Sequence, residues 1–166
     1  VAGSERMRIT NNGRIGIGTN NPQSLIDIQG TSTLGTMGAE MISASADRTF
    51  ASANNWTYNT GWTRNSASST ASTTASGAGT LTLANGFLSS APSVGNIYQI
   101  SFDVYSFATG TLQVSFGSAT SLINFGNVFR STQSQVVVIT AQGSGALTFT
   151  PSSSWLGTIT NISLKQ

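Results

Sequence analysis

The chain has 166 residues, of which 7% are charged, and its formal net charge of +2 comes from 7 basic and 5 acidic side chains. It contains neither histidine nor cysteine, which excludes histidine-dependent catalytic triads, disulfides and thiolate metal sites. The basic residues are scattered, whereas a nucleic-acid-binding surface needs them clustered, so we expect no nucleic-acid partner.

Residues 7–17 predict a β-hairpin. Apolar and polar residues alternate on both sides of Asn11-Asn12-Gly13, and Asn-Gly tolerates the positive φ angles of a tight hairpin turn. An isolated two-stranded hairpin is only marginally stable in water. We therefore expect Ile15 and Ile17 to pack against another surface, either other copies of the hairpin or the larger domain of the same chain.

The chain is predicted to contain three parts. Residues 1–30 are a hairpin segment that ends in a short apolar strand around Leu25–Ile28. Residues 31–46 are small and polar, and we expect a linker or a short helix there. Residues 47–166 are predicted to form the large domain.

The first part of the large domain contains aromatic residues and a polar stretch. Asn59-Thr60-Gly61 is a turn signal between two short aromatic runs, which predicts a hairpin over residues 54–65. Residues 66–79, SASSTASTTASGAG, have low complexity. We expect them to form a long polar loop or an exposed edge strand.

The clearest strand is IYQISFDVYSF, residues 97–107, because apolar and polar positions alternate along it. The predicted inner face consists of Tyr98, Ile100, Phe102 and Val104, and the outer face of Gln99, Ser101, Asp103 and Tyr105. TLQVSFG, residues 111–117, alternates in the same way.

The last strands complete the series. Residues 134–143 are apolar at nearly every position, so we expect that strand to be covered on both faces. Residues 145–151 and 156–165 follow, and in the last of these Ile159 and Ile162 are out of phase, which indicates a β-bulge. Short strands separated by Gly-rich turns predict an all-β fold, namely a short β-hairpin segment followed by an antiparallel β-sandwich of the jelly-roll type.

The acidic residues argue against an enzyme. A glycosidase needs two carboxylates about 5–10 Å apart, but only Asp103 lies after residue 50. The glycine-rich stretches have neither the lysine nor the spacing of a phosphate-binding loop. We expect no catalytic residues, no cofactor and no metal site.

The stretch ERMRITNNGRIGIGTNNPQSLIDIQG, residues 5–30, resembles a motif of phage tail fibres and related virion appendages. In that family the motif forms the end of a β-structured trimeric stem. The resemblance implies a homotrimer in which three hairpins cover one another's isoleucines.

Residues 54–166 resemble the carbohydrate-binding jelly-roll modules of phage and secreted bacterial proteins. The resemblance rests on NWTYNTGWT, IYQISFDVY, TGTLQVSFG and GSGALTFTPSSSWLGTITNISLK. Modules of this family often have Asp where Thr160 stands, and no metal is predicted here. The resemblance implies a carbohydrate ligand.

Candidate ligand-binding residues follow from the way proteins recognise sugars, with aromatic faces against the ring and polar groups on the hydroxyls. The candidates are Trp56, Tyr58, Trp62, Asp103, Tyr105, Gln113 and Arg130. For Trp56 and Trp62 a core or framework role is the favoured interpretation, because Trp is heavily buried on average. Asp103 has an alternative role in an ion pair with Arg130 or Arg64, and Gln113 neighbours it only if the two strands pair. Trp155 either caps the core or stands exposed at a loop tip.

These patterns and resemblances lead to one functional hypothesis. We expect the receptor-binding tip of a trimeric phage tail fibre, located on the virion and outside cells, which attaches to a host cell-surface glycan without cleaving it. No apolar run approaches the ~20 residues that cross a bilayer, so no membrane insertion is expected. The alternatives are a carbohydrate-binding module of a secreted bacterial protein and a structural spacer domain of a fibre.

Overall fold

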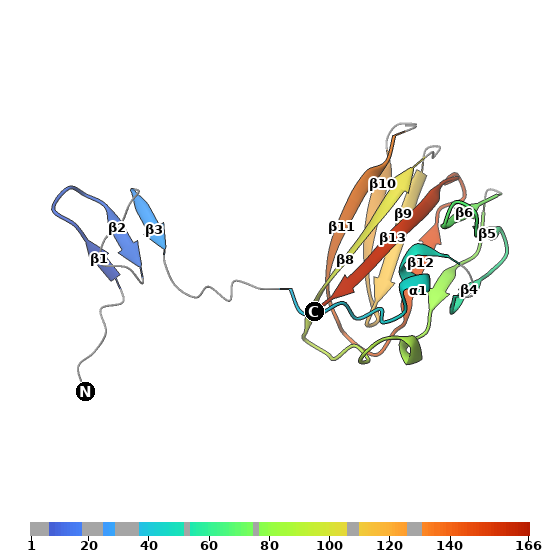
Figure 1. Ribbon diagram of the computed structural model, residues 1–166, viewed down its shortest axis with the longest axis horizontal. Helices are drawn as coiled ribbons and strands as arrows, with labels where there is room; N and C mark the ends of the chain where they lie inside the picture. Colours follow the sequence, from blue (N-terminus) through green and yellow to red (C-terminus); the bar gives the residue numbers. More distant parts are fainter. Residues whose placement is uncertain are drawn as a thin grey trace. The chain divides into compact units, whose positions relative to one another are not determined.

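The computed structural model describes residues 7–17, 25–28, 37–51, 54–74, 77–105, 110–125 and 131–166. The chain divides into two compact units, Val1–Thr36 and Met37–Gln166 (Figure 1). Arg130, one of the candidate ligand-binding residues, lies outside the described residues.

The first unit is a small three-stranded sheet, and the predicted hairpin is confirmed. Strands β1 (Met7–Ile9) and β2 (Ile15–Ile17) pair in an antiparallel manner, and β3 (Ile26–Ile28) adds to β2 in a parallel manner. Gly13 has a φ of 79° in the connecting turn, a value that favours glycine.

The exposed side chains of this unit are unusually apolar. Met7 is 56% exposed, Ile9 66% and Leu25 73%. Such residues contribute little to stability while they face water, so the described part of this sheet gains little from its own apolar content.

The second unit is a sandwich of two antiparallel five-stranded sheets, as predicted. One sheet, called the β9 sheet here, has the strand order β10-β9-β12-β7-β4, and the other, the β8 sheet, has the order β11-β8-β13-β6-β5. The strands of the β9 sheet are β4 (Trp56–Tyr58), β7 (Leu81–Leu83), β9 (Gly110–Phe116), β10 (Ala119–Phe125) and β12 (Leu147–Pro151). Those of the β8 sheet are β5 (Trp62–Asn65), β6 (Thr70–Thr73), β8 (Ile97–Tyr105), β11 (Gln133–Thr140) and β13 (Thr158–Lys165).

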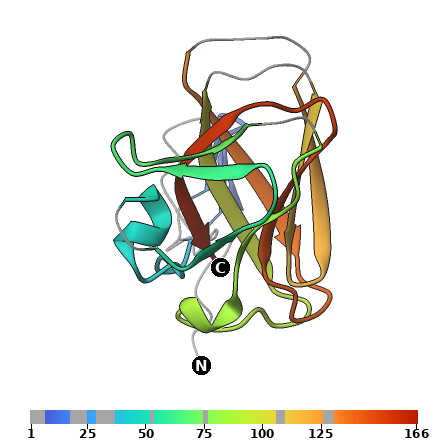
Figure 2. The ribbon, with the colours of Figure 1, turned by 90° about the vertical axis from the view of Figure 1, so that its right-hand side faces the viewer.

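Within the described ranges, two short helices accompany the sandwich. They are α1 (Ser45–Thr49) and the 3₁₀ helix η1 (Asn85–Phe87). The helix α1 packs against β13, beside the C-terminal end of that strand (Figure 2). Among the described residues, no helix is long and apolar enough to cross a membrane.

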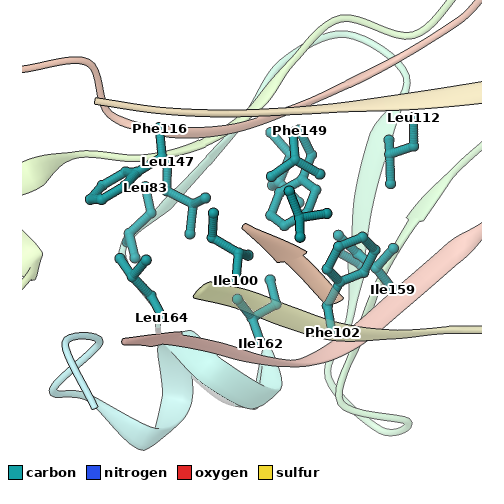
Figure 3. Packing of buried hydrophobic residues seen from close by; sticks show 14 of the residues in the cluster. Leu83, Ile100, Phe102, Leu112, Phe116, Leu147, Phe149, Ile159, Ile162 and Leu164 are labelled. Atoms are coloured by element: carbon teal, nitrogen blue, oxygen red, sulfur yellow. The ribbon is translucent and has the colours of Figure 1, made fainter. Parts of the chain in front are cut away.

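The core lies between the two sheets and contains the residues that alternation predicted. The even-numbered residues of β8 are buried from Tyr98 to Val104, and so are the apolar residues of β9. Figure 3 shows side chains from the two sheets packed against one another. The rings of Phe102 and Phe149, one from each sheet, meet edge to face with centroids 5.1 Å apart.

The predicted bulge in β13 is confirmed. The register between β13 and β8 shifts between Thr160 and Ser163. Asn161 has a φ of 51° there, in the left-handed region that asparagine tolerates better than most residues. The extra residue lets Ile159 and Ile162 both point into the core, although they are three positions apart.

The predicted hairpin over residues 54–65 is wrong. Strand β4 pairs with β7, and β5 pairs with β6 in the other sheet. The turn at Gly61 (φ 85°) therefore carries the chain from one sheet to the other. The physical reason is that Trp56 and Trp62 both enter the core, each from its own sheet.

Two further strands differ from expectation in their place in the sheet. Residues 70–73 of the low-complexity stretch form β6, an interior strand between β5 and β13, where Ala71 packs into the core. The apolar β11 is an edge strand, and its outward Val136 and Val138 are 61% and 63% exposed rather than covered.

The boundary of the large domain lies earlier than predicted. Residues 37–46 belong to the sandwich unit, because Met41 and Ile42 are buried in its core. The Met41 N–H also donates to the Leu164 carbonyl over 2.8 Å. A helix is present, but it begins only at Ser45. Residues 37–46 therefore form a segment that packs against β13, where a linker was predicted.

Hydrogen bonds to the Glu40 carboxylate join this segment to β13. Its Oε1 accepts from the N–H of Ile42 at 3.0 Å and from that of Leu164 at 2.9 Å, and its Oε2 accepts from the Ser163 hydroxyl. Hydrogen bonds to a carboxylate are stronger than neutral ones.

We expect Glu40→Ala to lower the free energy of unfolding by about 1–3 kcal/mol, because it leaves two backbone donors without their acceptor. Urea unfolding of both proteins measures this as a lower midpoint. Ser163→Ala, which removes one donor and leaves the carboxylate in place, is the matched control and should cost less. Equal midpoints for Glu40→Ala and the wild type would contradict this role.

Candidate functional site

The two tryptophans among the candidate residues are core residues. Trp56 is 6% exposed, and its Nε1–H donates to the Asp47 carbonyl over 2.7 Å. Trp62 is 5% exposed, its Nε1–H donates to the Gly79 carbonyl over 2.8 Å, and its ring lies 5.9 Å from that of Trp155. Neither ring has a free face against which a sugar could stack, so the structure removes both from the candidate site. Trp155 is fully buried and caps the core.

Tyr58 lies at the margin of the same aromatic cluster. It is half-buried, its ring lies 6.4 Å from that of Phe50, and its hydroxyl donates to Asn54 Oδ1 over 3.2 Å. Burial raises the pKa of the Tyr58 hydroxyl above its ordinary value of 10.0. The hydroxyl is therefore a neutral donor at physiological pH, held by its neighbour.

Asp103 is the centre of a polar network on the outer face of the β8 sheet. Its Oδ1 accepts from the Ser134 hydroxyl at 2.6 Å, and its Oδ2 accepts from Asn161 Nδ2 at 2.8 Å. The network therefore joins β11, β8 and β13. The described contacts of Asp103 include no ion pair with Arg64, whose Nη1 donates to the Ala51 carbonyl at 3.2 Å.

Asn161 connects this network to a pocket that the sequence did not reveal. The bulge places Asn161 at the rim, and the pocket has a volume of about 460 Å³. Its lining residues are Gly38, Ala39, Glu40, Arg48, Thr49, Asn161, Ile162, Ser163 and Lys165. The sequence offered one signal for this site, the out-of-phase Ile159 and Ile162 that flank Asn161.

The polar groups of the pocket carry both signs of charge. Glu40 supplies a carboxylate whose oxygens are already engaged, and Arg48 and Lys165 supply cations. The Nε of Arg48 is buried and has no hydrogen-bond partner among the described residues. A volume of this size is within the range of small-molecule sites, and the mixture of acceptors and donors suits a ligand rich in hydroxyl groups.

Tyr105 shares the outer face of β8 with Asp103. It is half-buried and stands opposite Thr158 of β13. On the same face, the exposed Val136 and Val138 of the edge strand β11 stand opposite Ser101 and Gln99 of β8 and add an apolar edge. This outward surface, called the β8 face below, consists of Gln99, Ser101, Asp103, Tyr105, Ser134, Val136, Val138 and the pocket at Asn161.

Gln113 does not belong to the β8 face. It lies on β9, which pairs with β10 and β12 and not with β8. Gln113 would lie near Asp103 and Tyr105 only if β9 paired with β8. The two strands follow one another in the chain but belong to opposite sheets. Among the described residues no group of three or more acidic side chains gathers in the manner of a metal site.

Comparisons with known proteins add similarity in fold alone. No protein-family model and no curated protein matches the sequence. The solved structure "BiXyn10A CBM1 APO" aligns at 17% identity and a TM-score of 0.49, over 65% of this chain and 81% of that one. The enzymatically active domain of bacteriophage CBA120 tailspike protein 4 aligns at 16% identity and a TM-score of 0.44, over 75% of this chain. The aligned part is 21% of the tailspike chain.

Proposed function

We propose that this chain is the receptor-binding tip of a trimeric phage tail fibre, which attaches the virion to a host cell-surface glycan without cleaving it. The observation that carries the proposal is the contrast between the two units. A sheet of three short strands, with Met7, Ile9 and Leu25 exposed, precedes a sandwich that has a complete core of its own.

The exposed residues of the first unit favour a homotrimer. A single small sheet with its apolar side chains in water is marginal, and association of identical chains buries such residues symmetrically. Trimerisation also places three sandwiches on one particle, so that weak sugar contacts add up to useful avidity.

The polar character of the sandwich surface supports a glycan as the ligand. On the β8 face, Asp103 presents a carboxylate held by two hydrogen bonds, beside Tyr105 and the pocket at Asn161. Convergent polar groups next to a partly exposed aromatic ring are typical of sites that bind sugars.

The positions of the carboxylates support binding without cleavage. Both oxygens of Glu40 accept hydrogen bonds within the fold, and both oxygens of Asp103 do so as well. Each carboxylate is therefore held in place by hydrogen bonds within the fold, and we infer no acid–base pair between them.

An array of bacterial surface glycans tests this proposal. We expect the wild-type chain to bind at least one glycan and to release no reducing ends from it. The combined variant Asp103→Ala/Tyr105→Ala should bind about tenfold more weakly or worse, since it removes a charged acceptor and the adjacent ring. Gln142→Ala, an exposed position between β11 and β12, is the control and should bind as the wild type does.

Three results would count against the proposal. Unchanged binding by the Asp103→Ala/Tyr105→Ala variant would remove the β8 face from recognition. Absence of binding to every glycan would favour a structural spacer. Release of reducing ends would indicate a hydrolase.

A further inference from the structure

A single row of hydroxyl side chains crosses the whole β9 sheet. In the strand register, Thr57 is opposite Thr82, Thr82 is opposite Thr148, Thr148 is opposite Ser115, and Ser115 is opposite Thr120. All five strands of the sheet thus contribute one Ser or Thr at the same level. We call these five residues the hydroxyl row.

The hydroxyl row lies on the outer face of the sheet. Its members are exposed or half-buried, and both neighbours along the strand are buried for Thr82, Ser115 and Thr148. At the two ends of the row, Thr57 and Thr120 are exposed. The helix α1 packs on the other sheet, against β13. Adjacent strands are about 4.8 Å apart, so five strands give a row roughly 19 Å long.

The hydroxyls of the row retain capacity for hydrogen bonds. Thr82 and Thr148 share one hydrogen bond at 3.3 Å, and the Ser115 hydroxyl accepts from Gln113 Nε2 at 3.3 Å. A hydroxyl has one donor and two acceptor positions, so each of the three can still bond to a ligand. Thr57 and Thr120, at the two ends of the row, are exposed.

The strands that carry the row have no charged side chains. None of the five strands of the β9 sheet contains Asp, Glu, Lys or Arg. Gln113 and Thr150 form the next level of the same face, together with Leu122, which is 64% exposed. An ionic ligand would find no counter-charge here, whereas an uncharged, hydroxyl-rich ligand would find both hydrogen bonds and an apolar contact.

We propose that the hydroxyl row binds a linear, uncharged polysaccharide that lies across the strands, with about one sugar for each strand. An extended β-linked pyranose chain repeats at a length per sugar comparable to the strand spacing, so successive sugars meet successive hydroxyls. A protein partner fits less well, because protein interfaces concentrate aromatic and arginine side chains that this face lacks. The inference rests on the proposed glycan-binding function. It places the linear, uncharged part of the glycan on the β9 sheet, on the opposite side of the sandwich from Asp103.

The test removes hydroxyls without changing shape. The double variant Thr82→Val/Thr148→Val replaces each hydroxyl with a methyl group, and Thr82→Ser/Thr148→Ser is the matched control that keeps both hydroxyls. Affinity electrophoresis through gels that contain soluble β-glucan, galactomannan or arabinoxylan measures binding to neutral chains, and a polygalacturonate gel measures binding to an acidic one.

We expect the wild type to be retarded by at least one neutral polysaccharide and not by polygalacturonate. The Val variant should lose about tenfold in affinity or more, since two hydrogen bonds are removed, and the Ser variant should stay within about twofold. Urea midpoints of all three proteins should agree closely, because the substituted side chains face outward. A second pair, Thr57→Val/Thr120→Val, repeats the test at the ends of the row.

Several outcomes would overturn the inference. Retention of wild-type affinity by both Val variants would do so, as would a wild type that no neutral polysaccharide retards. If in addition Asp103→Ala/Tyr105→Ala loses glycan-array binding, the proposed function stands and only the hydroxyl row is wrong. If the wild type binds no glycan on the array either, the proposed function fails with it.

Discussion

Trp56→Ala is expected to lower the free energy of unfolding by about 3–5 kcal/mol, the usual cost of truncating a large aromatic residue in a core. The ring of Trp56 lies 5.4 Å from that of Phe50 and 5.9 Å from that of Phe149. The substitution leaves a cavity between these rings, and it also removes the donor to the Asp47 carbonyl. Since small domains are stable by only about 5–15 kcal/mol, this variant should lose a large share of its stability.

Urea unfolding followed by tryptophan fluorescence measures the loss. Trp56→Phe is the matched control, because it keeps an aromatic ring in the core and loses only the indole N–H, so its cost should be clearly smaller. If Trp56→Ala keeps the wild-type midpoint but loses glycan binding, the residue is a ligand contact and its assignment to the core is wrong.

The contrast between Trp56 and Asp103 illustrates what the sequence could predict. Alternation in residues 97–105 separated the inner from the outer face, and the structure buries Phe102 while Asp103 points outward. The three-residue spacing of Ile159 and Ile162 likewise predicted the bulge. These are local signals, because the two-residue period of a strand decides the face that each side chain takes.

The position of each strand in its sheet was harder to predict, because it depends on partners far away in the chain. Strand β6 pairs with β13, and the hydroxyls of Ser72 and Thr158 meet although 86 positions separate them. No local pattern distinguishes such an interior strand from a polar loop. The same limit applies to β11, whose apolar sequence is that of a buried strand although it lies at an edge.

Asp103 and Tyr105 were candidates from the sequence, but the pocket at Asn161 and the hydroxyl row were missed for the same reason. The bond between Asp103 and Asn161 joins residues 58 positions apart, and the hydroxyl row combines strands from β4 to β12. Trp56 and Trp62 were candidates for sugar binding because aromatic residues often contact sugars, but both are buried in the core. The surface is left with hydroxyls, amides and a few charges, so hydrogen bonding rather than stacking dominates what it can offer a ligand.

Removal of the first unit is expected to have the largest effect on binding. If three copies of the small sheet hold the particle together, the full chain should have a mass in solution three times the 17.1 kDa of one chain, and residues 37–166 alone should be monomeric. Linked sites gain about 10²–10⁴ in avidity, so the shortened chain should lose about that factor in binding to a surface coated with glycan. Its affinity for a soluble, monovalent fragment of the same glycan should not change.

A point substitution separates trimerisation from the loss of chain length. Ile9→Asp places a charge on a residue that is 66% exposed in one chain, and in a trimer that buries it the charge would be strongly unfavourable. Val94→Asp, at a residue of the sandwich that is 72% exposed, is the matched control and should stay trimeric. Light scattering behind a sizing column measures the mass of each protein. A monomeric wild type at micromolar concentration, or a trimer that tolerates Ile9→Asp, would contradict the proposal that the first unit forms a trimeric stem. A monomer would favour a single-chain carbohydrate-binding module instead.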